Sequence, residues 1–208
     1  MKIYLIRHAR QDSKLCNVNV KLSEVGRQQA QLLGERLKYY KIDAIYSSDY
    51  IRAEETAQIV NQYIGVSHTV KPALREIDFG ELEGNSDEYN LERYGEFLKE
   101  RSAMQSDLAF PGGECGADVW NRAKDVLNEI ICTNYENVAV VTHGGTIRSI
   151  LAGVLGLDQV KKLQFGLSLE NTSITELFYH KERNQIYIER FNDYAHLEKE
   201  PSLLRRNW

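Results

Sequence analysis

The chain has 208 residues, a formal net charge of −4 and an isoelectric point near 5.8. Apolar residues make up 42% of it and charged residues 27%, a balance typical of an ordinary globular domain. No basic stripe is present, which disfavours nucleic acid as a partner, and no apolar run approaches the roughly 18 residues of a membrane span. We therefore expect a single domain over 1–208 that binds neither nucleic acid nor a membrane.

Two further features bear on location. The first apolar run, Ile3–Ile6, is short and is followed at once by Arg7, which does not fit a signal peptide. The three cysteines, Cys16, Cys115 and Cys132, are an odd set without CxxC spacing. Unpaired thiols are typical of a reducing compartment, so we predict a cytoplasmic protein.

The first half of the chain alternates predicted strands and helices. Ile3–Ile6 predicts a strand buried on both faces. Ser23 is a predicted N-cap for a helix with apolar residues at helical spacing, namely Ala30, Leu33, Leu37 and Tyr40. Asp43–Ser48 predicts a second strand. Asp49 is then the predicted N-cap of a helix with one apolar side, formed by Ala53, Ala57, Val60 and Ile64.

The segment 81–114 differs from its surroundings in being rich in charged and aromatic residues. It contains a predicted helix from Asp87 to about Met104 and ends at Pro111-Gly112-Gly113. We interpret this segment as a helical insertion over one end of the sheet, at the leaving-group side of any pocket there.

The second half returns to alternation. A helix with an apolar face follows, formed by Trp120, Ala123, Leu127 and Ile130, and then come a strand at Val138–Val141 and a helix at Thr146–Leu155. Ser173–Tyr179 and Gln185–Arg190 predict a hairpin, and the polar tail after His196 predicts a surface segment. This order favours an α/β fold of three layers, a mostly parallel, doubly wound sheet with helices on both faces.

Candidate site residues follow the ends of these strands. Arg7 and His8 follow the first strand, His143 and Gly144 follow the strand at Val138–Val141, and Arg52 lies in the first turn after the second strand. Ligands of such folds bind beyond the carboxyl ends of the strands, where helix N-termini favour anions. Arginine binds phosphate oxygens in pairs, and glycine allows close backbone approach. The pattern predicts a phosphate pocket.

A proton donor is also needed for phosphate-ester chemistry. The stretch "ALREIDFGELEG" offers four carboxylates, Glu76, Asp78, Glu81 and Glu83. Glu76 follows a short apolar stretch, and apolar surroundings raise the pKa of a carboxyl toward the working pH of a general acid. We expect Glu76 in such surroundings at the rim of the pocket.

The motifs together resemble the histidine phosphatase superfamily, also called the phosphoglycerate mutase-like family. The resemblance covers nearly the whole chain, in the family's order, through LIRHA (5–9), LSEVGRQQA (22–30), IYSSDYIRAEETA (45–57), LREIDFGELEG (74–84), PGGECGADVWNR (111–122), VVTHGGTIR (140–148) and NDYAHL (192–197). It implies a phosphatase-branch enzyme that acts through a phosphohistidine intermediate, without a cofactor or metal.

The resemblance also implies roles for individual residues. His8 is then the nucleophile, and Arg7, Arg52 and His143 hold the phosphoryl group, with Gly144 among the binding residues. Glu76 is the proton donor and later the base for water. Phosphoryl transfer depends mainly on positioning and charge neutralisation, which arginines supply.

Three positions depart from the family's pattern. Ala9 and Gln11 stand where relatives often have glycine and a hydroxyl residue. Gln11 still offers a hydrogen-bond donor, and we retain it as a weaker substrate contact. Cys115 replaces a serine, which leaves any role of that hydroxyl unassigned.

Two alternatives to a phosphatase stay open. A phosphoglycerate mutase shares the first half-reaction, and a phospho-ligand binding protein uses the same pocket without turnover. The continuation "IDFGELEG" after Glu76 resembles the phosphatase branch. The segment 81–114 shows no strong basic cluster, so the sequence predicts a small phosphorylated metabolite as substrate rather than a highly phosphorylated one.

Overall fold

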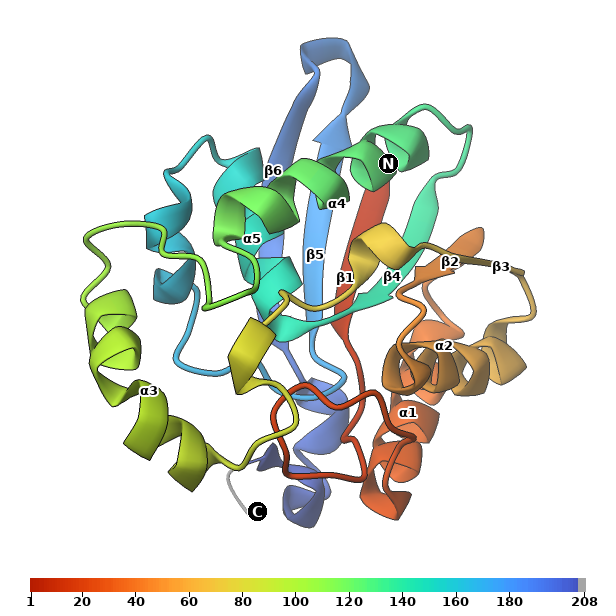
Figure 1. The fold of residues 1–208 in the computed structure, drawn as a ribbon. Coiled ribbons are helices and arrows are strands. Elements are labelled where there is room, and N and C mark those ends of the chain that lie inside the picture. Colours follow the sequence, from red (N-terminus) through yellow and green to blue (C-terminus); the bar gives the residue numbers. More distant parts are fainter. Residues whose placement is uncertain (206–208) are drawn as a thin grey trace.

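A computed structural model describes residues 1–205 of the chain. Figure 1 shows a central sheet with helices packed on both of its faces. The strands are β1 (Lys2–Arg7), β2 (Ala44–Ser47), β3 (Ser67–Val70), β4 (Asn137–Thr142), β5 (Ile174–His180) and β6 (Gln185–Asp193). The α-helices are α1 (Glu24–Leu37), α2 (Ile51–Ile64), α3 (Asp87–Ser102), α4 (Gly116–Ile131) and α5 (Gly144–Val154). None of the described helices is long and apolar enough to cross a membrane.

The six strands pair in the order β3-β2-β4-β1-β5-β6. β1 pairs in parallel with β4, β4 with β2, and β2 with β3, whereas β5 and β6 run antiparallel at one side. The predicted α/β class, with a mostly parallel sheet between two helical layers, is confirmed.

Alternating side chains of the central strands pack into two separate hydrophobic cores, one on each face of the sheet. One face of β1 and β4 packs on α4 and α5, through a cluster that includes Leu5, Val140, Leu127 and Ile147. The other face packs on α1 and α2, through a cluster that includes Ile6, Val141, Leu33 and Ala57. Burial of every apolar position explains why these strands read as continuous apolar runs.

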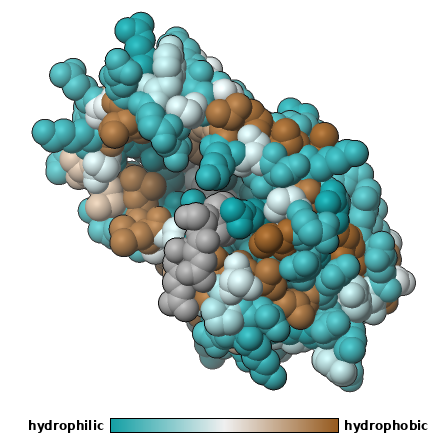
Figure 2. Space-filling model, turned by 90° about the horizontal axis from the view of Figure 1, so that it is seen from below, coloured by the Kyte–Doolittle hydropathy of each residue, from teal (hydrophilic) through white to brown (hydrophobic). Residues whose placement is uncertain are grey.

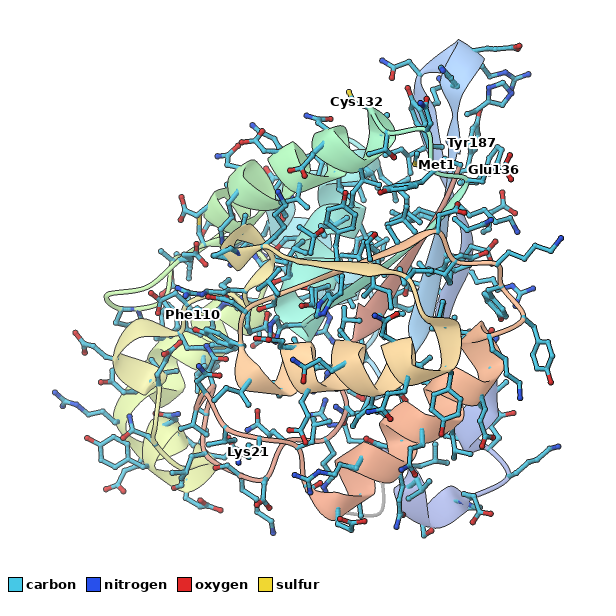
Figure 3. The ribbon with its side chains drawn as sticks, turned by 90° about the vertical axis from the view of Figure 1, so that its right-hand side faces the viewer. Met1, Lys21, Phe110, Cys132, Glu136 and Tyr187 are labelled. Atoms are coloured by element: carbon cyan, nitrogen blue, oxygen red, sulfur yellow. The ribbon has the colours of Figure 1, made fainter. Side chains whose placement is uncertain are left out.

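The register of the sheet brings the predicted site residues together. Arg7 on β1 lies opposite Thr142 on β4, and Ser47 on β2 lies opposite Val141. The three strands therefore end at one level, and His8 N donates to the Thr142 carbonyl at 2.8 Å. In Figure 3, Met1, Glu136 and Tyr187 lie at the opposite end of the molecule from Phe110, which follows α3.

Two predicted helix caps have different outcomes. Ser23 caps α1 as predicted, and its side chain accepts a hydrogen bond of 3.1 Å from Gly26 N. Asp49 does not cap α2, which follows Tyr50 without a side-chain cap. The Asp49 carboxylate instead accepts from Nε of Arg75 at 2.8 Å, because a charged partner stabilises it more than a neutral N–H group.

The tail after His196 is not a simple surface segment. Leu197, Leu203 and Leu204 are buried in one cluster, packed against Val25 and Leu32 of α1. The three leucines are spaced among charged residues, which explains why the tail reads as polar. This packing brings Arg205 to the carboxyl end of the sheet, where it lines the cavity described below.

Candidate active site

A cavity of about 420 Å³ lies at the carboxyl end of β1. Its walls come from the end of β1 and the loop after it, from α2, from the Glu76 segment, from the start of α3, from the loop before β5 and from the C-terminal tail. The lining residues are Arg7, His8, Gln11, Ser13, Lys14, Asn17, Arg52, Glu76, Phe79, Asp87, Asn171 and Arg205. Figure 2 views this end of the molecule, whose outer surface is predominantly hydrophilic. The convergence of the predicted strand ends on one cavity follows from the register of the sheet.

His8 is held in one orientation and one tautomer. Its Nδ1 lies 2.7 Å from the Ala9 carbonyl, and its Nε2 lies 3.2 Å from Nε of Arg52. Since a carbonyl only accepts and a guanidinium only donates, Nδ1 carries the proton and Nε2 the lone pair. Burial and then the charges of Arg52 and Arg7 lower the pKa of His8 well below its ordinary value. The ring is therefore neutral, as nucleophilic attack requires.

Arg52 is 2% exposed and is fixed on every side of its guanidinium. Nη1 donates to the Val18 carbonyl at 3.0 Å, and Nη2 donates to Oδ1 of Asn17 at 2.6 Å. Its plane lies over the Tyr50 ring, with Cζ 4.8 Å from the ring centroid. The charge is not neutralised by a carboxylate among the described residues and remains available for an anion beside His8.

Arg7 occupies the neighbouring wall. Its Nη1 donates to the Leu169 carbonyl, while its buried Nε has no hydrogen-bond partner among residues 1–205. Burial and then the nearby charge of Arg205 lower the pKa of Arg7 to about 9. The guanidinium is still a cation at neutral pH, and its free donor is unusual because buried donors are nearly always satisfied.

His143 lies behind His8 and does not line the cavity. The two ring centroids are 5.0 Å apart, and Nε2 of His143 lies 2.9 Å from Oγ of Ser48. Burial, followed by the charge of Arg52, lowers the pKa of His143 well below its ordinary value. Its Nδ1 is buried without a partner among the described residues. The sequence predicted neither Ser48 nor the Tyr50 ring, whose centroid is 5.4 Å from that of His143.

Glu76 is half-buried, and the apolar surroundings predicted for its carboxyl are wrong. Its oxygens accept backbone hydrogen bonds from Gly145 N at 3.2 Å, Thr146 N at 3.1 Å and Ile77 N at 2.9 Å. The carboxylate thus occupies the N-terminus of α5, where the helix dipole favours negative charge. That helix terminus, predicted to face the substrate, binds a side chain of the protein instead.

Of the two glycines after His143, Gly145 is the one that makes room for Glu76. A Cβ at Gly145 would lie 2.6 Å from Oε1 of Glu76, whereas one at Gly144 meets only Arg7, at 3.7 Å. Gly145 therefore makes room for the carboxylate. Gly144 lines an adjoining cavity and not the one that contains His8.

Arg122 of α4 fixes the backbone that carries Glu76. Its guanidinium donates to the carbonyls of Ala73, Arg75 and Glu76 at 2.7 to 2.9 Å. Its Nε and Nη2 also donate to the two oxygens of Glu114, each at 2.9 Å. The planar guanidinium of Arg122 therefore joins α4 to the segment that positions the Glu76 carboxylate.

Gln11 lines the cavity but uses its amide in the loop. Its Nε2 donates to the carbonyls of Ser13 at 3.0 Å and Leu15 at 3.3 Å. Two asparagines that the sequence did not indicate also line the cavity, Asn17 beside Arg52 and Asn171. Nδ2 of Asn171 donates to the His8 carbonyl at 2.7 Å and so ties β1 to the loop before β5.

Metal-ligating groups do not converge here. Within residues 1–205, no group of three or more histidine, cysteine, aspartate or glutamate side chains is arranged to hold a metal ion. Positive charge in the cavity comes from Arg7, Lys14, Arg52 and Arg205.

Comparison with known proteins agrees with this geometry. The chain is 32% identical over 180 residues to the metal-independent phosphoserine phosphatase of Arabidopsis thaliana, covering 85% of this chain and 72% of that protein. It is 32% identical over 177 residues to the 2,3-bisphosphoglycerate-dependent phosphoglycerate mutase of Rhizobium meliloti, covering 78% and 82%. The complex of a mycobacterial glucosyl-3-phosphoglycerate phosphatase with inorganic phosphate superposes with a TM-score of 0.83 and 27% identity, covering 94% and 98%.

The model of the histidine phosphatase superfamily (branch 1) matches residues 3–193. The chain therefore belongs to the histidine phosphatase superfamily and is a phosphatase of that type.

Proposed function

We propose that the protein is a metal-independent phosphomonoesterase that forms a phosphohistidine at Nε2 of His8. The observation that carries this proposal is the orientation of His8 between the Ala9 carbonyl and Nε of Arg52. It leaves an unprotonated nitrogen at the cavity, beside a cation that neutralises an incoming phosphate.

In the first step, Nε2 of His8 attacks phosphorus as the bond from phosphorus to the leaving oxygen breaks. Arg7 and Arg52 hold the phosphoryl oxygens from the wall of the cavity, His143 contributes its unpartnered Nδ1 from behind His8, and Gln11 is a weaker contact. Glu76 carries a proton for this step, a form that the negative charge of the bound phosphate favours over the carboxylate. It gives that proton to the leaving oxygen, which departs as an alcohol. The unpartnered Nε of Arg7 and Nδ1 of His143 support these binding roles.

In the second step, the Glu76 carboxylate takes a proton from water, whose oxygen attacks phosphorus. The bond between phosphorus and Nε2 breaks, and inorganic phosphate leaves with neutral His8 and protonated Glu76 restored. Both steps need charge neutralisation and in-line positioning, which the buried Arg52 and the half-buried Arg7 supply without a metal.

The proposed substrate is a small phosphorylated metabolite. Relatives named for phosphoserine and for glucosyl-3-phosphoglycerate support this class, and the cavity of about 420 Å³ is of a suitable size. Three unpaired cysteines support a reducing, cytoplasmic location.

A mutase is the second candidate, favoured by the relative from Rhizobium meliloti. It shares the first step and returns the phosphoryl group to a sugar acid instead of water. Release of inorganic phosphate from p-nitrophenyl phosphate in chelator supports the phosphatase. Interconversion of phosphoglycerates, stimulated by bisphosphoglycerate, supports the mutase, and binding without turnover supports a non-catalytic protein.

The decisive experiment traps the covalent intermediate. Wild-type protein is mixed with a phosphate ester, quenched in alkali and examined by mass spectrometry for phosphate on His8. His8→Ala should lose the adduct and at least about a thousandfold in kcat. His180→Ala, on the β5–β6 hairpin, is the matched control and should keep both. An adduct on another residue, or more than about a tenth of the activity in His8→Ala, contradicts the proposal.

A further inference from the structure

A second cavity, of about 250 Å³, adjoins the first, and Arg7, Glu76, Phe79 and Arg205 line both. Cationic side chains from separate parts of the chain meet in it. We call this cavity the basic pocket and define it by Arg7, Arg101, Arg148, Lys162 and Arg205. The segment 81–114 contributes only Arg101, which explains why its composition showed no basic cluster.

Three of these cations have no carboxylate partner among residues 1–205, namely Arg7, Arg101 and Arg148. Arg148 donates to the backbone carbonyls of residues 165, 166 and 167. These carbonyls hold the guanidinium in place without neutralising its charge. Lys162 differs, because it pairs with Asp107. The pocket thus keeps an excess of positive charge beside Glu76.

Arg101 is presented to this pocket in a fixed position. It lies in the last turn of α3, and its Cζ is 4.4 Å from the Phe110 ring centroid. Its Nε is buried without a hydrogen-bond partner among the described residues, as is Nε of Arg7. Two unsatisfied arginine donors around one cavity indicate a ligand with acceptor oxygens, since proteins rarely bury donors without partners.

The cations of the pocket also destabilise one another. Burial lowers the pKa of Arg101 and of Arg148, and the charge of Arg148 lowers the pKa of Arg101 further. The charge of Arg205 acts in the same direction on Arg148 and Arg7. An anion bound among them removes this repulsion.

We infer that the basic pocket binds a second anionic group, a carboxylate or a phosphate, carried by the leaving group of the substrate. The inference rests on the proposed function, in which the leaving oxygen meets Glu76 while phosphorus faces His8. Because Glu76 lines both cavities, a leaving group that passes it enters the basic pocket. Arg101 is then a specificity-determining residue that touches the part of the substrate away from phosphorus.

The test compares substrates that differ only in the second anion. The values of kcat/KM are measured for phosphoserine against phosphoethanolamine, which lacks the carboxylate, and for fructose 1,6-bisphosphate against fructose 6-phosphate. In the wild type, the substrate with the second anion should have the higher kcat/KM in at least one pair. Which pair shows this preference tells whether the pocket binds a carboxylate or a phosphate. Arg101→Gln should reduce that ratio by roughly tenfold or more, as loss of a charge-assisted hydrogen bond does.

Arg93→Gln is the matched control, since Arg93 is exposed on the same helix and lines neither cavity. It should leave the ratio unchanged, and Arg101→Lys should restore part of it. An unchanged ratio in Arg101→Gln overturns the inference. The inference is also overturned if Lys14→Gln, rather than Arg101→Gln, lowers the ratio, because Lys14 lines only the first cavity.

Two further outcomes are distinguishable. If Arg101→Gln does not fold, as judged by circular dichroism, Arg101→Lys carries the test. It must lower the ratio without abolishing the preference, and an unchanged ratio overturns the inference. If the wild type hydrolyses no ester, the proposed function fails while the pocket is still tested by calorimetry. Phosphoserine must then bind the wild type more tightly than phosphoethanolamine, or fructose 1,6-bisphosphate more tightly than fructose 6-phosphate, with the difference lost in Arg101→Gln. Equal affinities in both pairs overturn the inference.

Discussion

Nε of Arg52 donates a hydrogen bond of 3.2 Å to Nε2 of His8. The same arginine lowers the pKa of His8 and lies where an anion beside that nitrogen would be neutralised. One cation therefore links the protonation state of the proposed nucleophile to the binding of its substrate, so the two properties change together on substitution.

Replacing Arg52 tests this link through the pH dependence of the reaction. Arg52→Gln should lower kcat/KM for p-nitrophenyl phosphate by roughly a hundredfold or more, because a donor to the transferring group is lost. Removing the positive charge also raises the pKa of His8. As the pH is lowered, kcat/KM should therefore begin to fall at a higher pH than in the wild type, which shifts the acid limb of the profile upward. The measurement is a pH profile of kcat/KM for both proteins.

Arg27→Gln is the control for that experiment, since Arg27 pairs with Glu55 and lies outside the cavity. Its profile should match that of the wild type. An acid limb that stays in place in Arg52→Gln despite the loss in rate would show that Arg52 does not set the protonation of the nucleophile.

Glu76 should matter most when the leaving group is poor. An alkoxide needs a proton as it departs, whereas p-nitrophenolate needs little help. Glu76→Gln should therefore slow phosphorylation of His8 far more with an alkyl phosphate than with p-nitrophenyl phosphate. Dephosphorylation should also slow, so phosphohistidine should accumulate with the activated ester. Single-turnover kinetics on both esters measure these effects.

The control is Asp78→Asn, because Asp78 lies two residues from Glu76 but accepts from Gly80 N and does not line the His8 cavity. It should show no dependence on the leaving group. If Asp78→Asn shows that dependence and Glu76→Gln does not, the proton donor is Asp78.

Two glycines in helices should respond oppositely to alanine. At Gly26 on α1 an added Cβ would lie 2.1 Å from the Arg10 carbonyl oxygen, so Gly26→Ala should destabilise the fold by about 1 to 3 kcal/mol. At Gly95 on α3 the nearest atom is 3.9 Å away, and Gly95→Ala should stabilise it by about 0.5 to 1 kcal/mol. Urea denaturation measures both, and a stabilised Gly26→Ala would refute the close approach.

Stability should fall in mild acid because of buried neutral histidines. His196 accepts from Nη1 of Arg36 at 3.3 Å, and burial followed by the Arg36 charge lowers its pKa to about 4. The unfolded chain takes up this proton near pH 6.5, so the free energy of unfolding decreases as the pH falls from about 6.5 to about 4. His196 accounts for roughly 3 kcal/mol over that range, and His8 and His143 act in the same direction.

Denaturation of the wild type and of His196→Gln near pH 7 and near pH 4.5 isolates this contribution. The variant should lose less stability between the two conditions than the wild type. His180→Gln, on the hairpin, should lose as much as the wild type. Equal losses in His196→Gln and the wild type would contradict the assignment.

Most of the fold is predictable from the sequence, because apolar residues recur with the period of each element. Ile3–Ile6 and Val138–Val141 are continuous apolar runs, and both are central parallel strands. β3 is the exception: Ser67–Val70 is largely exposed and polar, and it is held by backbone pairing with β2. An edge strand of that kind leaves no apolar pattern to detect.

The site is predictable where it follows the strand ends and not where it depends on packing between distant segments. The convergence of Arg7, His8 and Arg52 follows from adjacent parallel strands. The setting of Glu76 could not be derived in this way, because it depends on how its segment packs against α5. The basic pocket joins Arg101 to Arg148, which belong to elements that are not consecutive along the chain.

The contact between Arg122 and Glu114 has a consequence for how the chain can change over evolutionary time. Arg122 makes five hydrogen bonds, two to Glu114 and three to backbone carbonyls. Loss of Glu114 leaves a partly buried cation, and lysine at 122 replaces a planar fork with a point charge. A substitution at position 114 or 122 alone therefore removes hydrogen bonds that hold the backbone of Glu76 in place. Among descendants of this sequence, residues 114 and 122 should therefore covary, and the pair should be lost together in lineages that abandon catalysis.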